Sequence, residues 1–162
     1  MSRAFVREPD SELPPAVPER AISRHPNLVT ATGLKKIEQQ VQQLEQLRAR
    51  NDASTDLTTL ARLDRDLRYW RQRRATARVI ESEAMPYVVR FGVAVDLRLS
   101  DASERSYQIV GEDEADPAAG LISWVSPVGS ALIGHRLGDQ LELAGQSAEI
   151  VGLRAAPATQ PS

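Results

Sequence analysis

The sequence predicts an α+β protein, in which an antiparallel pair of helices precedes a small antiparallel β-sheet with one short helix. Three observations predict this fold. Apolar residues recur every three or four positions within residues 30–80, they alternate with polar residues over 89–99, and Ser126-Pro127 opens a short apolar segment. The expected parts are a flexible N-terminal tail at 1–29, a coiled-coil hairpin at 30–80, a linker at 81–87, a β domain at 88–154 and a flexible tail at 155–162.

The composition narrows the functional classes. The 162 residues carry a formal net charge of −2, which does not favour a general nucleic-acid binder. The absence of cysteine excludes disulfides and thiolate metal sites, and the two histidines lie far apart, so we expect no metal site and no cofactor of its own. No apolar run reaches the ~20 residues of a membrane span, and the start lacks the apolar core of a signal peptide. We expect a cytoplasmic protein, monomeric when free, that does not contact membranes.

The N-terminal stretch is rich in proline. Residues 1–29 hold five of the ten prolines, and proline removes backbone donors and disfavours helix in the residue before it. The simplest interpretation is a flexible tail. The alternative is a docking peptide anchored by Phe5 and Val6.

Residues 30–80 contain two amphipathic stretches on either side of a turn at 51–56. Thr30 or Thr32 is suited to cap the first helix. Arg74 interrupts the apolar positions of the second. The two apolar stripes comprise Leu34, Ile37, Val41, Leu44 and Leu47, then Leu60, Leu63, Leu67, Trp70 and Ala77. Helices joined by a short turn bury such stripes on each other, which predicts an antiparallel hairpin with arms of about 20 residues, or ~30 Å.

The second helix has a surplus of arginine, notably Arg62, Arg65, Arg68 and Arg71. Two interpretations stay open. These residues form a solvated face with i,i+4 ion pairs, or they form a basic flank that meets RNA or an acidic channel wall.

The second half reads as strands and turns. Alternation from Val89 to Leu99 predicts a half-buried strand, and 106–110 predicts its partner. An acidic loop at 111–120 is either a solvated turn or a partner for basic groups of another protein. A short strand at 121–125 follows, then a helix capped by Ser126 with Pro127 at its first position. Strands near 141–143 and 148–153 complete the sheet.

Residues 107–138, YQIVGEDEADPAAGLISWVSPVGSALIGHRLG, resemble the C-terminal domain of the GreA/GreB transcription elongation factors. The Thr-x-x-Gly-Leu at 30–34 resembles the start of that family's first long helix. The resemblance implies an FKBP-like topology for the β domain and docking at the secondary-channel rim of bacterial RNA polymerase, near the nascent RNA 3′ end. It also implies that the docking residues are Ser126, Pro127, Val128, Gly129, Ser130, Glu112, Asp113 and Glu114.

The turn of the hairpin is where the family carries two acids that help hold the polymerase's active-site Mg²⁺. The matching candidates are Asp52 and Asp56, which sequence logic alone explains equally as a helix-end residue and an N-cap. The family's acidic tip motif is missing and the arms are shorter than the usual ones. These departures favour a regulator with no catalytic residues of its own, which occupies the channel without stimulating RNA cleavage. A prolyl isomerase and a coiled-coil adapter are the competing interpretations.

Overall fold

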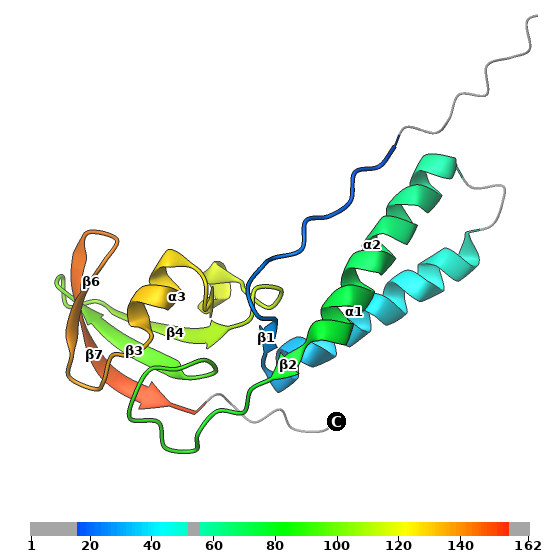
Figure 1. Cartoon of the computed structure of the whole chain (residues 1–162). Helices are drawn as coiled ribbons and strands as arrows, with labels where there is room; N and C mark the ends of the chain where they lie inside the picture. Colours follow the sequence, from blue (N-terminus) through cyan, green and yellow to red (C-terminus); the bar gives the residue numbers. More distant parts are fainter. Residues whose placement is uncertain (1–15, 52–55, 156–162) are drawn as a thin grey trace, which may run out of the picture.

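The computed structural model describes residues 16–51 and 56–155, and Figure 1 shows a helical hairpin that projects from a small β domain. The hairpin consists of α1 (Ala31–Arg50) and α2 (Leu57–Thr76). The β domain holds a five-stranded sheet in the order β5-β4-β3-β7-β6 with one short helix, α3 (Pro127–Leu132). The α+β prediction is confirmed.

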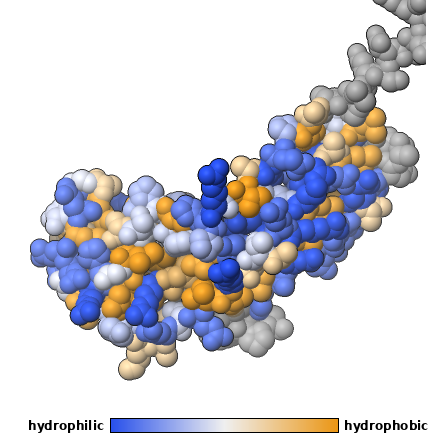
Figure 2. All heavy atoms as spheres, in the orientation of Figure 1, coloured by the Kyte–Doolittle hydropathy of each residue, from blue (hydrophilic) through white to orange (hydrophobic). Residues whose placement is uncertain are grey.

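The two arms of the hairpin are equal, because each helix has 20 residues. Ile37 and Val41 of α1 and Leu67 of α2 are buried, and all three belong to the predicted apolar stripes. Apolar side chains near the turn are not buried between the helices, because Leu47 is 47% and Leu57 is 60% exposed. Figure 2 accordingly shows hydrophobic atoms at the far end of the hairpin, while hydrophilic atoms dominate the rest of its visible face.

The sheet core comes from the inward positions of alternating strands. In β3 (Ala94–Leu99) Val95, Leu97 and Leu99 are buried, as the alternation predicts. Leu132 of α3 is fully buried against this face, and Ala131 and Ile133 pack beside it. The remaining elements are β4 (Glu104–Val110), the 3-10 turn η1 (Pro117–Ala119), β5 (Leu121–Ser123), β6 (Gln140–Leu143) and β7 (Gln146–Arg154).

Two details of the sheet differ from the expectation. β3 begins at Ala94 instead of Val89, because the chain turns at Gly92, whose φ is +84°. Val89 and Val93 nevertheless remain buried. The pairing of β4 with β5 is parallel, whereas an entirely antiparallel sheet was expected. The ten residues from Gly111 to Gly120 carry the chain back before it pairs again, as a parallel connection requires.

The segment before α1 is not a tail throughout. Leu28–Val29 forms β1, which pairs in parallel with β2 (Arg78–Val79) directly after α2. The prediction of a flexible tail up to residue 29 is therefore wrong at its C-terminal end, because β1 supplies backbone hydrogen bonds that the sequence pattern does not reveal. The remainder of the predicted tails at 1–15 and 156–162 lies outside the described residues.

Candidate functional site

The described end of the hairpin turn is organised by Asp56. Its carboxylate accepts hydrogen bonds from the Thr59 backbone N–H at 3.0 Å and the Thr59 hydroxyl at 3.2 Å, so Asp56 is the N-cap of α2. The backbone hydrogen bond from Thr59 is the main reason that the pKa of Asp56 is lowered, and the positive charge of Arg62 adds to it. Of the two candidate tip acids, Asp56 is used as a cap, and Asp52 lies outside the described residues.

The arginines of α2 are mostly paired inside the chain. Arg65 pairs with Asp66 at 2.9 Å, Arg71 with Glu45 at 2.8 Å, and Arg68 with Glu19. These pairs are partly or largely exposed, so each contributes little to stability. Their formation nevertheless reduces the net positive field of this helix face. Arg62, Arg68 and Arg71 are all exposed, and Arg62 acts on Asp56 through its charge.

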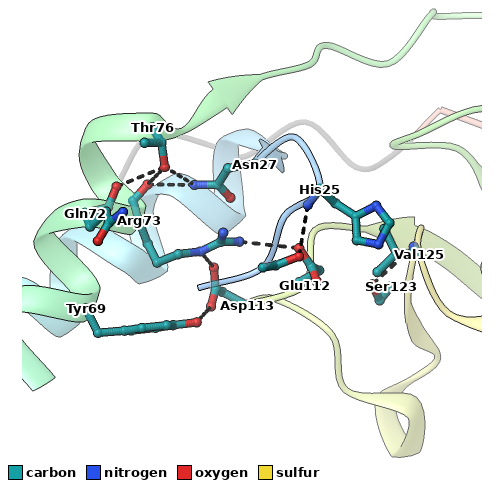
Figure 3. Close-up of polar contacts among 11 residues, drawn as sticks. His25, Asn27, Tyr69, Gln72, Arg73, Thr76, Glu112, Asp113, Ser123 and Val125 are labelled. Atoms are coloured by element: carbon teal, nitrogen blue, oxygen red, sulfur yellow. Dashed lines mark hydrogen bonds and ion pairs between the residues drawn. The ribbon is translucent and has the colours of Figure 1, made fainter. Parts of the chain in front are cut away.

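The hairpin and the β domain meet at a cluster centred on Arg73. Its side chain is 3% exposed, and its Nε donates to Asp113 Oδ2 at 2.5 Å (Figure 3). A second nitrogen lies 3.8 Å from Glu112 Oε2. The Tyr69 hydroxyl donates to the other oxygen of Asp113 at 2.7 Å, so two consecutive turns of α2 converge on one carboxylate. We call Tyr69, Arg73, Glu112 and Asp113 the junction cluster.

A second contact between the two parts explains the Thr-x-x-Gly pattern at 30–33. The Thr30 hydroxyl accepts from the Gly33 N–H at 2.9 Å, which caps α1, and donates to Glu114 Oε2 at 2.6 Å. A β-carbon at Gly33 would lie 2.6 Å from the same Glu114 oxygen, so a larger residue would force the Glu114 carboxylate to shift from Thr30. Glu114 is only 6% exposed. The start of α1 is thereby fixed to the acidic loop.

The acidic loop is thus a contact within the chain. The sequence left two alternatives for Glu112, Asp113 and Glu114, a solvated turn or a polymerase-facing surface. The solvated turn is wrong for Asp113 and Glu114, whose carboxylates are buried against Arg73 and Thr30. A contact of this loop with polymerase stays a prediction. A buried carboxylate requires a hydrogen-bonded partner, and the loop finds its partners on the hairpin.

Tyr69 makes this junction sensitive to high pH. Burial and then the hydrogen bond to Asp113 raise its pKa from 10.0 to about 12. Because the folded state favours the neutral phenol, its stabilisation is complete below pH 10 and is lost as the pH rises through 12. We expect the urea midpoint to fall over this range, and the fall to be smaller in Tyr69→Phe. If the urea midpoint fell equally with pH in the parent and in Tyr69→Phe, the contact between Tyr69 and Asp113 would be contradicted.

The segment 126–130 forms the start of α3. Ser126 is its N-cap, since its hydroxyl accepts from the Gly129 N–H at 3.0 Å and donates to Ser123 O at 2.7 Å. Pro127 and Ser130 are exposed and Val128 is half-buried, so these three side chains are open to a partner. Gly129 is buried, and the expectation that it lies on the exposed side is wrong. A β-carbon there would come within 2.1 Å of Ser123 O, so Gly129 lets α3 approach β5.

Three residues at the junction were missed by sequence reasoning. Arg73 was one arginine among several, Tyr69 lay beside the predicted stripe, and Asn27 fell in the presumed tail. Asn27 is 6% exposed, and its side-chain amide donates to Arg73 O at 2.7 Å. The surplus of arginine in α2 facing a Glu-Asp-Glu loop was the available signal for Arg73.

The described chain offers few other chemical sites. No group of three or more histidine, aspartate or glutamate side chains within 16–51 and 56–155 is arranged to hold a metal ion. None of the helices in these ranges combines the length and apolarity that crossing a membrane requires.

The protein thus consists of a helical hairpin and a small, mostly antiparallel β domain, joined by buried contacts at the base of the hairpin. Residues 85–151 match the family model described as "Transcription elongation factor, GreA/GreB, C-term". Residues 85–151 are thus similar to the C-terminal domain of the GreA/GreB factors, and the resemblance carried by residues 107–138 is confirmed.

Curated relatives match a little under half of the chain. It is 49% identical over 71 residues to "Transcription elongation factor GreA" of Methylobacterium sp. (strain 4-46), covering 41% of this chain and 45% of that protein. It is 42% identical over 79 residues to the protein of the same name from Desulfovibrio desulfuricans, covering 48% and 49%. The chain therefore matches about half the length of these relatives.

Two solved structures were also similar. "GreA factor homolog 1 (Gfh1) protein of Thermus thermophilus" is 21% identical with a TM-score of 0.41, covering 81% of this chain and 100% of that one. "Prokaryotic transcription elongation factor GreA/GreB from Nitrosomonas europaea" is 24% identical with a TM-score of 0.40, covering 78% and 98%.

Proposed function

We propose that this protein is a regulator of transcription elongation that binds bacterial RNA polymerase. In this proposal the β domain docks at the rim of the secondary channel and the hairpin enters the channel of paused or backtracked complexes. The observation that carries the proposal is the match of residues 85–151 to the GreA/GreB C-terminal domain, supported by relatives named "Transcription elongation factor GreA".

The proposed docking surface is the outer side of α3. Pro127 and Ser130 are exposed there and Val128 is half-buried, which suits a small contact patch on a rigid support. The burial of Leu132 and the close approach at Gly129 hold this helix against the sheet. The patch therefore keeps its shape when a partner binds, and a preformed patch lowers the entropic cost of association.

The hairpin supports occupancy of the channel without stimulated cleavage. Each arm has 20 residues, which corresponds to ~30 Å of helix. The Asp56 carboxylate is held by Thr59 as a helix cap, whereas a group that shares a metal ion needs free oxygen ligands. The protein itself would then catalyse nothing, and its effect would come from blocking the channel or competing with other factors.

Two alternatives have different consequences. If Asp52 and Asp56 reach the polymerase's Mg²⁺, the protein stimulates cleavage of the nascent RNA 3′ end by the polymerase. If the hairpin serves as an adapter, its partner would contact the exposed Leu47 and Leu57, and polymerase would not be needed.

A backtracked polymerase complex with end-labelled RNA tests the proposal. We expect the full chain to bind the complex, leave the RNA length unchanged and protect it from an added cleavage factor. The variants are Asp52→Ala/Asp56→Ala and, as a control, Asp101→Ala in an exposed turn of the β domain. Shortening that disappears only in the double variant would establish a cleavage factor, and absence of binding would contradict the proposal.

A further inference from the structure

Residues 16–29 run along α2 and then cross to the β domain, as Figure 1 shows, and we call them the strap. We propose that the strap fixes the direction in which the hairpin leaves the β domain, and that Asn27 and Arg20 are its positioning residues. The consequence at polymerase rests on the proposed function above, whereas the orientation itself is a property of the free protein.

The first anchor of the strap is Asn27, at the base of α2. Its side-chain amide donates to Arg73 O at 2.7 Å and to the Thr76 hydroxyl at 3.1 Å (Figure 3). Its own carbonyl accepts from the Arg78 N–H at 2.8 Å. Asn27 thus binds the last turn of α2, whose carbonyls lack partners within the helix. Since Asn27 is buried, this anchor is shielded from competing water.

The second anchor lies further along α2 and holds Arg20. The guanidinium carbon of Arg20 is 3.8 Å from the centre of the Tyr69 ring and 5.4 Å from that of Trp70. One guanidinium nitrogen also lies 3.8 Å from Asp66. A cation over aromatic faces with a carboxylate beside it makes a specific contact. Between Asp66 and Thr76 the strap follows α2 for ~15 Å.

The third anchor is on the β domain. A β-carbon at Gly111 would lie 2.4 Å from the carbonyl oxygen of Leu28, so the strap backbone passes directly over this glycine. The ring of His25 stands edge-on to Trp124, with centroids 5.8 Å apart and an interplanar angle of 77°. Trp124 lies two residues before Ser126, so the strap passes the proposed docking surface at His25 before it ends in β1.

Together the three anchors oppose rotation of the hairpin. The covalent link through β2, the junction cluster and the contact of Thr30 with Glu114 hold only the base of the hairpin. The strap adds two contacts with α2 and one with the β domain. A rotation of the hairpin relative to the β domain must therefore break contacts on one of the two parts. A hairpin held in one direction is pre-organised for entry, because its competent orientation is already the populated one.

The chain has no cysteine, so a pair of thiols can be introduced for spin labels. Gln43 of α1 and Glu142 of β6 are exposed and suit this purpose. Distances between the labels would be measured by electron–electron double resonance in the full chain and in Arg20→Ala/Asn27→Leu. We expect a single narrow distribution in the parent and one roughly twice as wide in the double variant, because further orientations become populated.

Two more variants separate positioning from general loss of structure. Arg20→Lys keeps a cation over the rings, so its distance distribution should be narrower than that of Arg20→Ala alone. Arg24→Ala, in an exposed part of the strap, should leave it unchanged. In each of these variants the unfolding midpoint of the β domain, followed by Trp124 fluorescence, should change little. Equal widths in the parent and the double variant would overturn the proposal.

Polymerase binding provides the functional readout. We expect the double variant to dock as the parent does through α3, but to protect backtracked RNA roughly tenfold less well, since fewer molecules hold the competent orientation. Equal protection by both would overturn the functional consequence of the strap. If the parent failed to bind polymerase while the distance distributions changed as expected, the proposed function would fail and the strap would stand.

Discussion

Arg73→Ala is expected to lower the free energy of unfolding by about 3–5 kcal/mol, because removing one member of a buried ion pair leaves the other charge without compensation. Arg73 is 3% exposed and faces Asp113 and Glu112, so its loss leaves two carboxylates next to each other at the junction. Tyr69 would keep its hydrogen bond to Asp113 but could not neutralise it.

Urea unfolding followed by tryptophan fluorescence measures this loss, since Trp70 reports on the hairpin and Trp124 on the β domain. The matched control is Arg74→Ala, one residue away on the exposed side of α2. The control should change stability by less than about 0.5 kcal/mol. Similar losses in the two variants would show that the junction cluster does not stabilise the protein.

Gly129→Ala is expected to displace α3 and to cost about 1–3 kcal/mol, as overpacking of a well-packed site does. The new β-carbon would lie 2.1 Å from the backbone oxygen of Ser123, which cannot rotate away as a flexible side chain would. In an unconstrained helix the same change would be stabilising. The sign of the effect therefore tests the packing itself.

The thermal midpoint and polymerase affinity of Gly129→Ala should both fall, because α3 carries the proposed docking residues. Ser130→Ala is the neighbouring control. It removes an exposed hydroxyl that donates to Ser126 O at 2.8 Å, and we expect a smaller thermal effect. A Gly129→Ala protein with unchanged stability would contradict the described approach of α3 to β5.

The sequence predicted those features that depend on local chemistry. The hydrophobic period located both helices, Thr30 and Asp56 were among the candidate caps, and alternation identified the buried residues of β3. Ser126-Pro127 marked the start of α3. Each of these depends on residues close together in the chain, so spacing alone reveals them.

The junction could not be predicted because its contacts join residues far apart in the chain. Arg73 and Asp113 are separated by 40 positions, and Thr30 and Glu114 by 84. In a single sequence each of these residues has the appearance of an ordinary surface charge or cap. Asn27 was hidden for the same reason, since proline-rich composition describes backbone freedom and says nothing about a partner on α2.

The most direct test of the account is the binding of the purified chain to core bacterial RNA polymerase, measured by labelling the exposed end of α1 and titrating the enzyme. We expect saturable binding that Pro127→Ala/Ser130→Ala weakens and that Arg98→Ala, on an exposed strand position, leaves unchanged. No binding, or binding that the double variant does not weaken, would contradict the claim that this protein acts on polymerase through its β domain.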